Sequence, residues 1–123
     1  MRLLSVDDSA IIRKIVRGAA EVLGSELLEA SDGLEALSIL QNNKDIDLVL
    51  LDWNMPGMNG FELLKKIKSN DLLKNIPVMM VTTETERENI VMSIKYGAIN
   101  YLVKPFSLEE LIKKVMECLG RGD

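Results

Sequence analysis

The sequence predicts an α/β fold in which a parallel five-stranded sheet is covered by helices on both faces. Short apolar runs alternate five times with longer stretches whose apolar residues recur at helical spacing. Strands joined through helices pair in parallel, because each parallel crossover needs a long connection. The run at 48–51 (LVLL) is apolar at every position, as expected for a strand buried on both faces. We expect residues 1–123 to form one domain with no separate output domain.

The first half of the chain is expected to supply three strands and two helices. The strands are expected at 3–6, 26–30 and 47–52. The first helix carries apolar residues with helical spacing over 11–23, and Gly24 is expected to end it. The second helix is expected to begin at the sequence 32–35 (DGLE), which resembles a capping box, and to run to about Leu40.

The second half is expected to supply two strands and three helices. The strands are expected at 77–82 and 101–103, the former with Pro77 at its first position, where proline is tolerated. Capping pairs are expected to open the helices, and these are Asn59 with Glu62, Thr85 with Glu88, and Ser107 with Glu110. Residues 120–123 are expected to form a frayed tail.

Composition excludes several functional classes. The net charge of −4 argues against a nucleic-acid surface, and no apolar run approaches the ~20 residues of a membrane span. The chain has no histidine, which excludes histidine-ligated zinc, catalytic triads and histidine general bases. Cys118 is the only cysteine and no leader opens the sequence, so we expect a reducing, cytoplasmic environment.

Polar residues follow the predicted strands at their carboxyl ends, where open α/β sheets bind ligands. These residues are Asp7, Asp8, Asp52, Thr82, Thr83 and Lys104. Taken singly, each has an ordinary structural explanation, such as helix capping for Asp7 and Asp8 or a solvated surface for Lys104. Crowded carboxylates repel one another, and Mg²⁺ relieves this while keeping room for a phosphate oxygen. A lysine and a threonine hydroxyl in the same place suit a phosphoryl group.

Four motifs resemble the receiver domain of two-component response regulators, and especially the single-domain chemotaxis regulators of the CheY type. They are VDDS at 6–9, LDWNMPGMNGFELL at 51–64, VTTE at 81–84 and GAINYLVKPF at 97–106. The resemblance covers essentially the whole chain. It implies a flavodoxin-like sheet with strand order 2-1-3-4-5, and a signalling protein rather than an enzyme of metabolism.

The resemblance also implies a role for each site residue. Asp52 would accept a phosphoryl group from a phosphohistidine, and the protein would catalyse its own phosphorylation and dephosphorylation. Lys104 and Thr82 would bind phosphoryl oxygens, and Tyr101 would be an aromatic switch. Asp8 and Asp52 would coordinate Mg²⁺, with Asp7 acting through water and the backbone carbonyl of Asn54 completing the site. Asn54, Thr83 and Glu84 would tune the rate of dephosphorylation. The peptide bond before Pro105 would be cis.

The implied partners are a sensor histidine kinase of the chemotaxis type and an output protein. The output protein, for which a flagellar motor switch protein is the candidate, would bind the face formed by the fourth helix, fifth strand and last helix. A phosphatase is a further candidate partner. We expect a monomer that binds neither nucleic acid nor membrane. A phosphorelay intermediate, or a receiver fragment of a larger regulator, is the alternative. The basic residues Arg13, Lys14 and Arg17 on the first helix are either a solvated face or part of the kinase-docking surface.

Three rival functions fit the residues less well. An aspartate-dependent phosphatase would carry Asp-x-Asp after the first strand, whereas the residue two beyond Asp52 is Asn54. A flavodoxin would need a phosphate loop rich in Ser, Thr and Gly after the first strand, and 7–12 is DDSAII. A receiver-like module that is never phosphorylated would not need the complete residue set. One position departs from the family pattern, since Thr83 stands where Ala or Gly is usual, and it is expected to narrow the mouth of the site.

Overall fold

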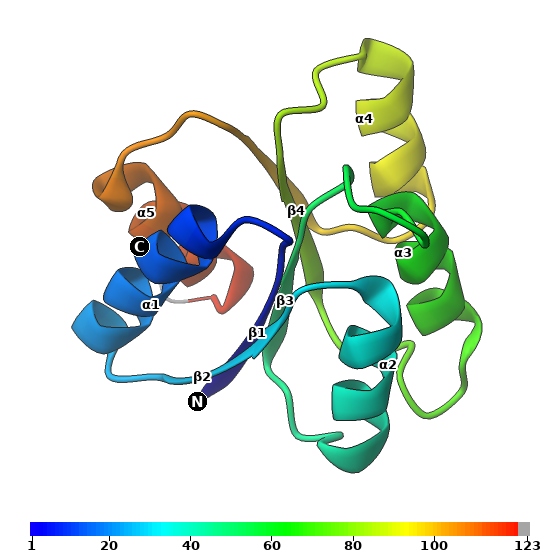
Figure 1. Ribbon diagram of the computed structural model, residues 1–123, viewed down its shortest axis with the longest axis horizontal. Coiled ribbons are helices and arrows are strands. Elements are labelled where there is room, and N and C mark those ends of the chain that lie inside the picture. Colours follow the sequence, from blue (N-terminus) through cyan, green and yellow to red (C-terminus); the bar gives the residue numbers. More distant parts are fainter. Residues whose placement is uncertain (121–123) are drawn as a thin grey trace.

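The computed structural model describes residues 1–120 and shows a central sheet between two helical layers (Figure 1). The strands are β1 (Arg2–Val6), β2 (Glu26–Ala30), β3 (Leu48–Leu51), β4 (Val78–Thr82) and β5 (Asn100–Val103). The helices are α1 (Ala10–Leu23), α2 (Gly33–Asn42), α3 (Gly60–Ser69), α4 (Arg87–Lys95) and α5 (Leu108–Cys118). The five strands are parallel in the order β2-β1-β3-β4-β5, which confirms the predicted fold. Of the expected tail, 121–123 lies outside the described residues.

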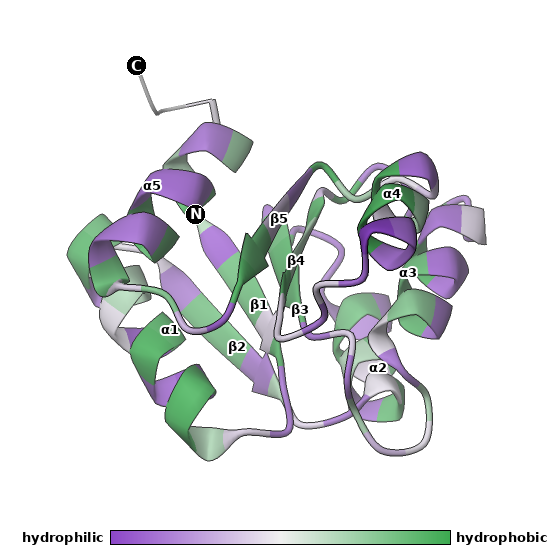
Figure 2. Cartoon of the chain, turned by 90° about the horizontal axis from the view of Figure 1, so that it is seen from above, coloured by the Kyte–Doolittle hydropathy of each residue, from purple (hydrophilic) through white to green (hydrophobic). Residues whose placement is uncertain are grey.

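The alternation of side chains along the strands divides the core into two clusters. Leu4, Val49 and Leu51 belong to the cluster shared with α2 and α3, while their neighbours Leu48 and Leu50 pack with α1 and α5. Helices α1 and α5 lie on one side of the sheet, and α2, α3 and α4 on the other (Figure 1). In Figure 2, hydrophobic residues lie along the strands between these two layers. This arrangement explains why β3 is apolar throughout, since both of its faces are covered.

Two of the predicted helix starts form complete capping boxes. Asn59 with Glu62 opens α3, and Ser107 with Glu110 opens α5. At α2, Asp32 accepts a hydrogen bond from the Glu35 backbone N–H, but the Glu35 carboxylate turns to the N–H of Ser31, so only half of the expected box forms. Gly24 ends α1 with a φ of 65° and donates its N–H to the last turn, as predicted.

The predicted capping pair at α4 is wrong. The helix begins after Glu86, which makes no side-chain capping bond, rather than after Thr85. The preceding loop uses other contacts, because the Glu84 carboxylate accepts from the Glu86 N–H at 2.8 Å and the Thr82 hydroxyl accepts from the Glu84 N–H at 3.2 Å. β2 has the predicted bounds, and those of the other strands differ from the predicted ones by at most one residue, with β3 ending at Leu51 and β5 beginning at Asn100.

No helix in the described part of the chain is long and apolar enough to cross a membrane.

Candidate functional site

Two aspartates lie just beyond the carboxyl ends of the adjacent strands β1 and β3. Asp7 donates its backbone N–H to the carbonyl of Ala30 at 3.0 Å, and Asp52 donates its N–H to the carbonyl of Val6 at 3.0 Å. The backbone of each residue is therefore held by sheet-like hydrogen bonds. Asp7 is 3% exposed and Asp52 is 5% exposed, so both carboxylates sit where desolvation is costly.

Asp8 completes a group of three carboxylates with Asp7 and Asp52. One ligand oxygen from each lies within 4.8 Å of the others, and within residues 1–120 this is the only such cluster of acidic, histidine or cysteine side chains. Backbone N–H groups orient the two buried members, because Ser9 donates to Asp7 Oδ1 at 2.9 Å and Asn54 donates to Asp52 Oδ1 at 3.1 Å. The turns that follow β1 and β3 thus aim the carboxylates at one point.

Lys104 supplies the positive charge at this cluster. Its Nζ donates to Asp7 Oδ2 at 2.7 Å and to Asp52 Oδ2 at 3.3 Å. Lys104 follows β5, its backbone N–H is bonded to the carbonyl of Thr82, and the Lys104–Pro105 peptide bond is cis, as the resemblance implied. Burial raises the pKa of Asp7, the bonds from Lys104 and Ser9 lower it, and the nearby charge of Asp52 raises it further. The pKa of Asp7 therefore lies above its ordinary value, with burial as the main cause. Independently of that shift, three carboxylates meet a single ammonium group here, so the formal charge of the cluster is negative.

The donor set of this cluster fits a hard divalent cation. Carboxylate oxygens are ligands that Mg²⁺ prefers, and Mg²⁺ sites use one or two carboxylates while keeping waters. Two of the three carboxylates are buried and the third, Asp8, is exposed, so the cluster opens to solvent on one side. A cation there would supply the positive charge that Lys104 alone does not.

Thr82 and Asn54 lie beside the cluster. Thr82 ends β4 and is fully buried. Its Oγ1 accepts from the Glu84 N–H at 3.2 Å and lies 3.5 Å from Asn54 Nδ2, which also donates to Thr83 Oγ1 at 3.2 Å. The side chain of Asn54 therefore connects the loop after β3 to the loop after β4, across the exposed rim of the site.

Hydrogen bonds link Tyr101 to Thr82 through Glu84. Its hydroxyl donates to the backbone carbonyl of Glu84 at 2.7 Å, while the Glu84 N–H donates to Thr82. Burial, together with the nearby charges of Glu84 and Asp52, raises the pKa of Tyr101 to about 12. The Tyr101 ring is only partly buried, so a change in the site could bury it more deeply.

The sequence argument missed two residues that hold the site. Gly60 donates its N–H to the Trp53 carbonyl at 2.8 Å, and a Cβ there would clash with the Asp52 carbonyl and lie 2.8 Å from Trp53 Cα. Arg13 Nη1 donates to the Asp7 carbonyl oxygen at 2.6 Å. The position of the glycine straight after the Asn59 cap was a usable signal for the first. Nothing in the local sequence distinguished Arg13 from other basic residues of its helix.

The predicted basic stripe on α1 is not a uniformly solvated face. Arg13 Nε lies 3.4 Å from Glu29 Oε1, and Arg17 binds the same carboxylate through Nε and Nη2 at 3.1 and 2.9 Å. Lys14 is exposed. The two arginines therefore pair with an acidic residue of β2, although Arg17 remains exposed, as Lys14 does. The alternative that these residues form part of a kinase-docking surface stays a prediction.

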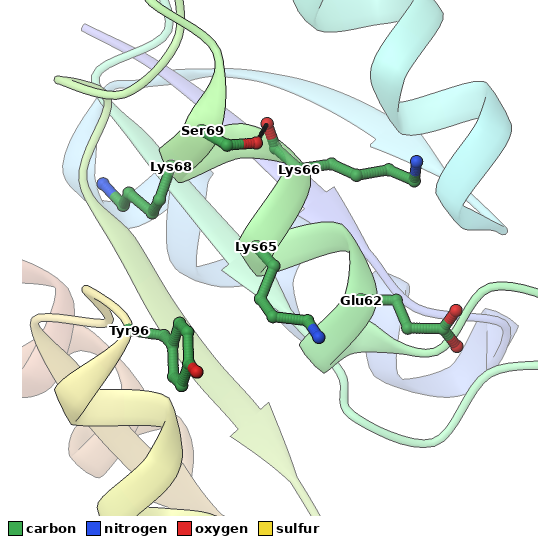
Figure 3. Close-up of a pocket in the computed structure, with 6 residues that line it drawn as sticks. All are labelled: Glu62, Lys65, Lys66, Lys68, Ser69 and Tyr96. Carbon is green, nitrogen blue, oxygen red and sulfur yellow. Dashed lines mark hydrogen bonds between the residues drawn. The ribbon is translucent and has the colours of Figure 1, made fainter.

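A groove between α3 and the end of α4 is separate from the acidic cluster (Figure 3). It has a volume of about 540 Å³ and is lined by Glu62, Lys65, Lys66, Lys68, Ser69 and Tyr96. None of the three clustered carboxylates, Asp7, Asp8 and Asp52, borders it. Phe61 of α3 stacks on Trp53 with ring centroids 5.0 Å apart, and it meets the ring of Tyr96 edge-on with centroids 5.2 Å apart. Aromatic packing therefore joins α3 to the end of α4 at this groove.

Comparisons with known proteins give one family. The model of the response regulator receiver domain matches residues 3–116. The chemotaxis protein CheY1 of Helicobacter pylori is 43% identical over 124 residues, covering all of both chains. The chemotaxis protein CheY homolog of Campylobacter jejuni is 42% identical over 99% of this chain and 95% of its own. The solved structure of Vibrio cholerae CheY4 superposes with a TM-score of 0.89 at 39% identity, over 96% of this chain and 98% of the other.

Proposed function

The chain belongs to the response regulator receiver family, and from this premise we propose that it is a signalling switch phosphorylated on Asp52. The donor is a phosphohistidine of a partner histidine kinase. A carboxylate oxygen of Asp52 attacks phosphorus, a P–O bond forms, and the P–N bond to the donor histidine breaks. Phosphoryl transfer needs positioning and charge neutralisation rather than a general base. The absence of histidine from the chain is therefore no obstacle.

The observation that carries this proposal is the burial of Asp52 beside two further carboxylates and one lysine. Asp8 and Asp52 are assigned to Mg²⁺, with Asp7 acting through water and the backbone carbonyl of Asn54 completing the site. When bound there, Mg²⁺ would neutralise charge on the transferring phosphoryl group. Lys104 already lies 3.3 Å from Asp52 Oδ2. It needs little movement to reach an oxygen of a phosphoryl group attached to that carboxylate.

Thr82 is assigned to the phosphoryl group and to the start of the signal. Its hydroxyl accepts hydrogen bonds in the described structure, which leaves its own hydrogen to donate to a phosphoryl oxygen. Movement of Thr82 toward that oxygen disturbs the Glu84 N–H bonded to it, and Glu84 in turn holds the Tyr101 hydroxyl. We assign Tyr101 to a switch that reshapes the face of α4, β5 and α5, where the output protein binds.

The output is assigned to chemotaxis, with a flagellar motor switch protein as the proposed partner. The Helicobacter and Campylobacter relatives that support this are named chemotaxis proteins and align over nearly their full lengths. Helix α4 contributes exposed apolar residues to the proposed face, and these are Val91, Met92 and Ile94. A reducing, cytoplasmic location fits the single cysteine of the chain.

Phosphorylation by a small acyl phosphate in the presence of Mg²⁺ tests this function. We expect one phosphoryl group per chain, stable in acid and labile in base as an acyl phosphate requires, and a complete loss of incorporation in Asp52→Asn. Asp45→Asn, an exposed carboxylate far from the site, is the matched control and should label as the wild type does. Labelling of Asp52→Asn at the wild-type level would refute the assignment.

Thr82→Ala separates the chemistry from the signal. This variant keeps the Asp52 carboxylate, so it should still accept phosphate, but it lacks the hydroxyl that ties the site to Glu84 and Tyr101. Its affinity for a peptide or domain of the output protein should rise little on phosphorylation, because binding and phosphorylation are coupled only through the switch. A gain in affinity equal to that of wild type would show that the signal takes another route.

A further inference from the structure

The peptide that joins Asp7 to Asp8 is held by a guanidinium group. The Asp7 N–H is bonded to the carbonyl of Ala30, and its carbonyl oxygen accepts from Arg13 Nη1 at 2.6 Å. Each of the two peptide groups that flank Asp7 is thus hydrogen-bonded, and the one held by Arg13 leads to Asp8. A bond donated by an ionised group is roughly twice as strong as one between neutral groups. The direction in which Asp8 leaves β1 is therefore tied to the position of Arg13.

Arg13 itself is anchored by a second contact. Its Nε lies 3.4 Å from Glu29 Oε1 on β2. The Glu29 carboxylate also accepts hydrogen bonds from Arg17 at both of its oxygens. The side chains of Arg13 and Glu29 are both mostly buried, at 22% and 27% exposure. The guanidinium therefore connects the first residue after β1 to the neighbouring strand β2, with one contact at each end.

We infer that Arg13 is a positioning residue that fixes the Asp7–Asp8 turn so that the carboxylates converge on a divalent cation. The inference rests on the proposed function, because it assigns a residue outside the acidic cluster to the cation affinity of that cluster. Arg17 is not assigned this role, since it binds Glu29 but makes no bond to Asp7.

Because Arg13 is positively charged, the direction in which its removal changes the Mg²⁺ affinity tests this role. A guanidinium group near a cation site repels the cation, so a residue that acted only through its charge would weaken Mg²⁺ binding, and removing it would tighten binding. A residue that acts by holding the turn has the opposite effect, and removing it weakens binding. Outer partners that orient metal ligands typically contribute about 10- to 100-fold in metal affinity.

The dissociation constant for Mg²⁺ should be measured by calorimetric titration of the wild type, Arg13→Met, Arg13→Lys and Arg17→Met. Arg13→Met keeps an unbranched side chain and loses both the charge and the bond, and its dissociation constant should rise about tenfold. Arg13→Lys keeps the charge, but its single ammonium group cannot bind Asp7 and Glu29 together. The dissociation constant of this variant for Mg²⁺ should therefore rise by a smaller factor. Arg17→Met removes a charge from the same carboxylate and leaves the bond from Arg13 to Asp7 in place. Its dissociation constant should therefore stay within about twofold of wild type, well below the change expected for a lost orienting partner.

Urea unfolding in the presence of EDTA shows whether each variant remains folded, so that cation affinity is compared only between folded proteins. An unchanged or lower dissociation constant in Arg13→Met overturns the inference, and so does an equal rise in Arg17→Met. If Arg13→Met does not fold, Arg13→Lys decides, because an unchanged constant in that variant also overturns the inference. A wild-type protein that binds no Mg²⁺ would instead overturn the proposed function itself.

Discussion

The two edges of the sheet each gather three carboxylates near one basic residue, but they bury these carboxylates differently. At the carboxyl edge the group is Asp7, Asp8 and Asp52 around Lys104. At the amino edge Glu26 and Asp45 bind the Arg2 guanidinium, and Asp47 accepts a hydrogen bond from the Arg2 backbone N–H. Both groups draw on several strands or their flanking loops, so neither composition nor charge separates them.

Burial separates the two groups clearly. The Lys104 side chain is 11% exposed, and the side chains of its partners Asp7 and Asp52 are 4% and 6% exposed. Arg2 pairs with Glu26 and Asp45 at 2.9 and 3.0 Å, but these carboxylate side chains are 70% and 69% exposed. Water already solvates the charges at the amino edge, so their pairing adds little to stability. At the carboxyl edge the charges have lost water, and the excess of carboxylates there is a cost that a bound cation removes.

The largest expected difference between the edges is the effect of removing the basic residue. Lys104→Met leaves two buried carboxylates with no ammonium partner, and breaking a buried pair in this way costs on the order of 3 kcal/mol. Arg2→Met leaves only solvated carboxylates, and the loss should be much smaller. Urea unfolding at neutral pH in EDTA measures both. Equal losses would mean that burial does not distinguish the edges. Added Mg²⁺ should increase the free energy of unfolding of Lys104→Met more than that of the wild type.

Neutralising one carboxylate at each edge sharpens the comparison. Asp52→Asn leaves Lys104 paired with Asp7 alone, so the metal-free protein should gain about 1–2 kcal/mol in its free energy of unfolding. Asp45→Asn removes a solvated charge and should leave stability within experimental error of wild type. Thermal unfolding in EDTA provides the measurement. A loss of stability in Asp52→Asn would show that Lys104 already compensates both buried carboxylates.

Much of the carboxyl edge could be predicted from the sequence, because strand ends in a parallel sheet meet at one edge. Asp7, Asp52, Thr82 and Lys104 each follow an apolar run, and a parallel sheet brings such positions together whatever their separation along the chain. The strand order came from the family resemblance and is confirmed. The apolar patterns of the strands and of α1 and α5 were strong because each has one or two fully covered faces.

Features that depend on tertiary contacts could not be predicted. The Thr85–Glu88 pair has the spacing of a capping box, yet Thr82, Glu84 and Tyr101 organise that loop and the helix begins one residue later. Arg13 looked like any basic residue of α1, and only the packing of that helix against β2 brings it to Asp7. The amino-edge group was missed for the same reason, since its members are far apart in sequence and follow no motif.

Thr83 tests how far the rim controls access to the carboxyl edge. Its hydroxyl accepts from Asn54 Nδ2 at 3.2 Å, which closes part of the mouth between two loops. Thr83→Ala removes this bond and two side-chain atoms, so phosphorylation by a small donor and hydrolysis of the phosphate should both accelerate about two- to fivefold, the equivalent of ~0.5–1 kcal/mol. Stopped-flow fluorescence and phosphate release give the two rates. Rates that stay level or fall would show that this position is not a gate.

The smallest expected effect concerns salt. At about 1 M NaCl the screening length falls to ~3 Å, so exposed pairs lose most of their attraction while buried pairs are screened much less. The stability difference between wild type and Arg2→Met should therefore vanish on going from low salt to about 1 M, and the difference for Lys104→Met should persist. If both differences shrank together, the carboxyl-edge pairs would be as solvated as those of Arg2.

The most direct test of whether the carboxyl edge holds the cation is a Mg²⁺ titration followed by Trp53 fluorescence. Trp53 is the only tryptophan, adjoins Asp52 and stacks on Phe61, so a change of charge at the site should alter its emission. We expect a saturable response at millimolar Mg²⁺ in wild type, the same response in Asp45→Ala, and a response in Asp8→Ala only at far higher concentration. Identical titrations of wild type and Asp8→Ala, or a weakened response in Asp45→Ala alone, would contradict the assignment of the cation to the carboxyl edge.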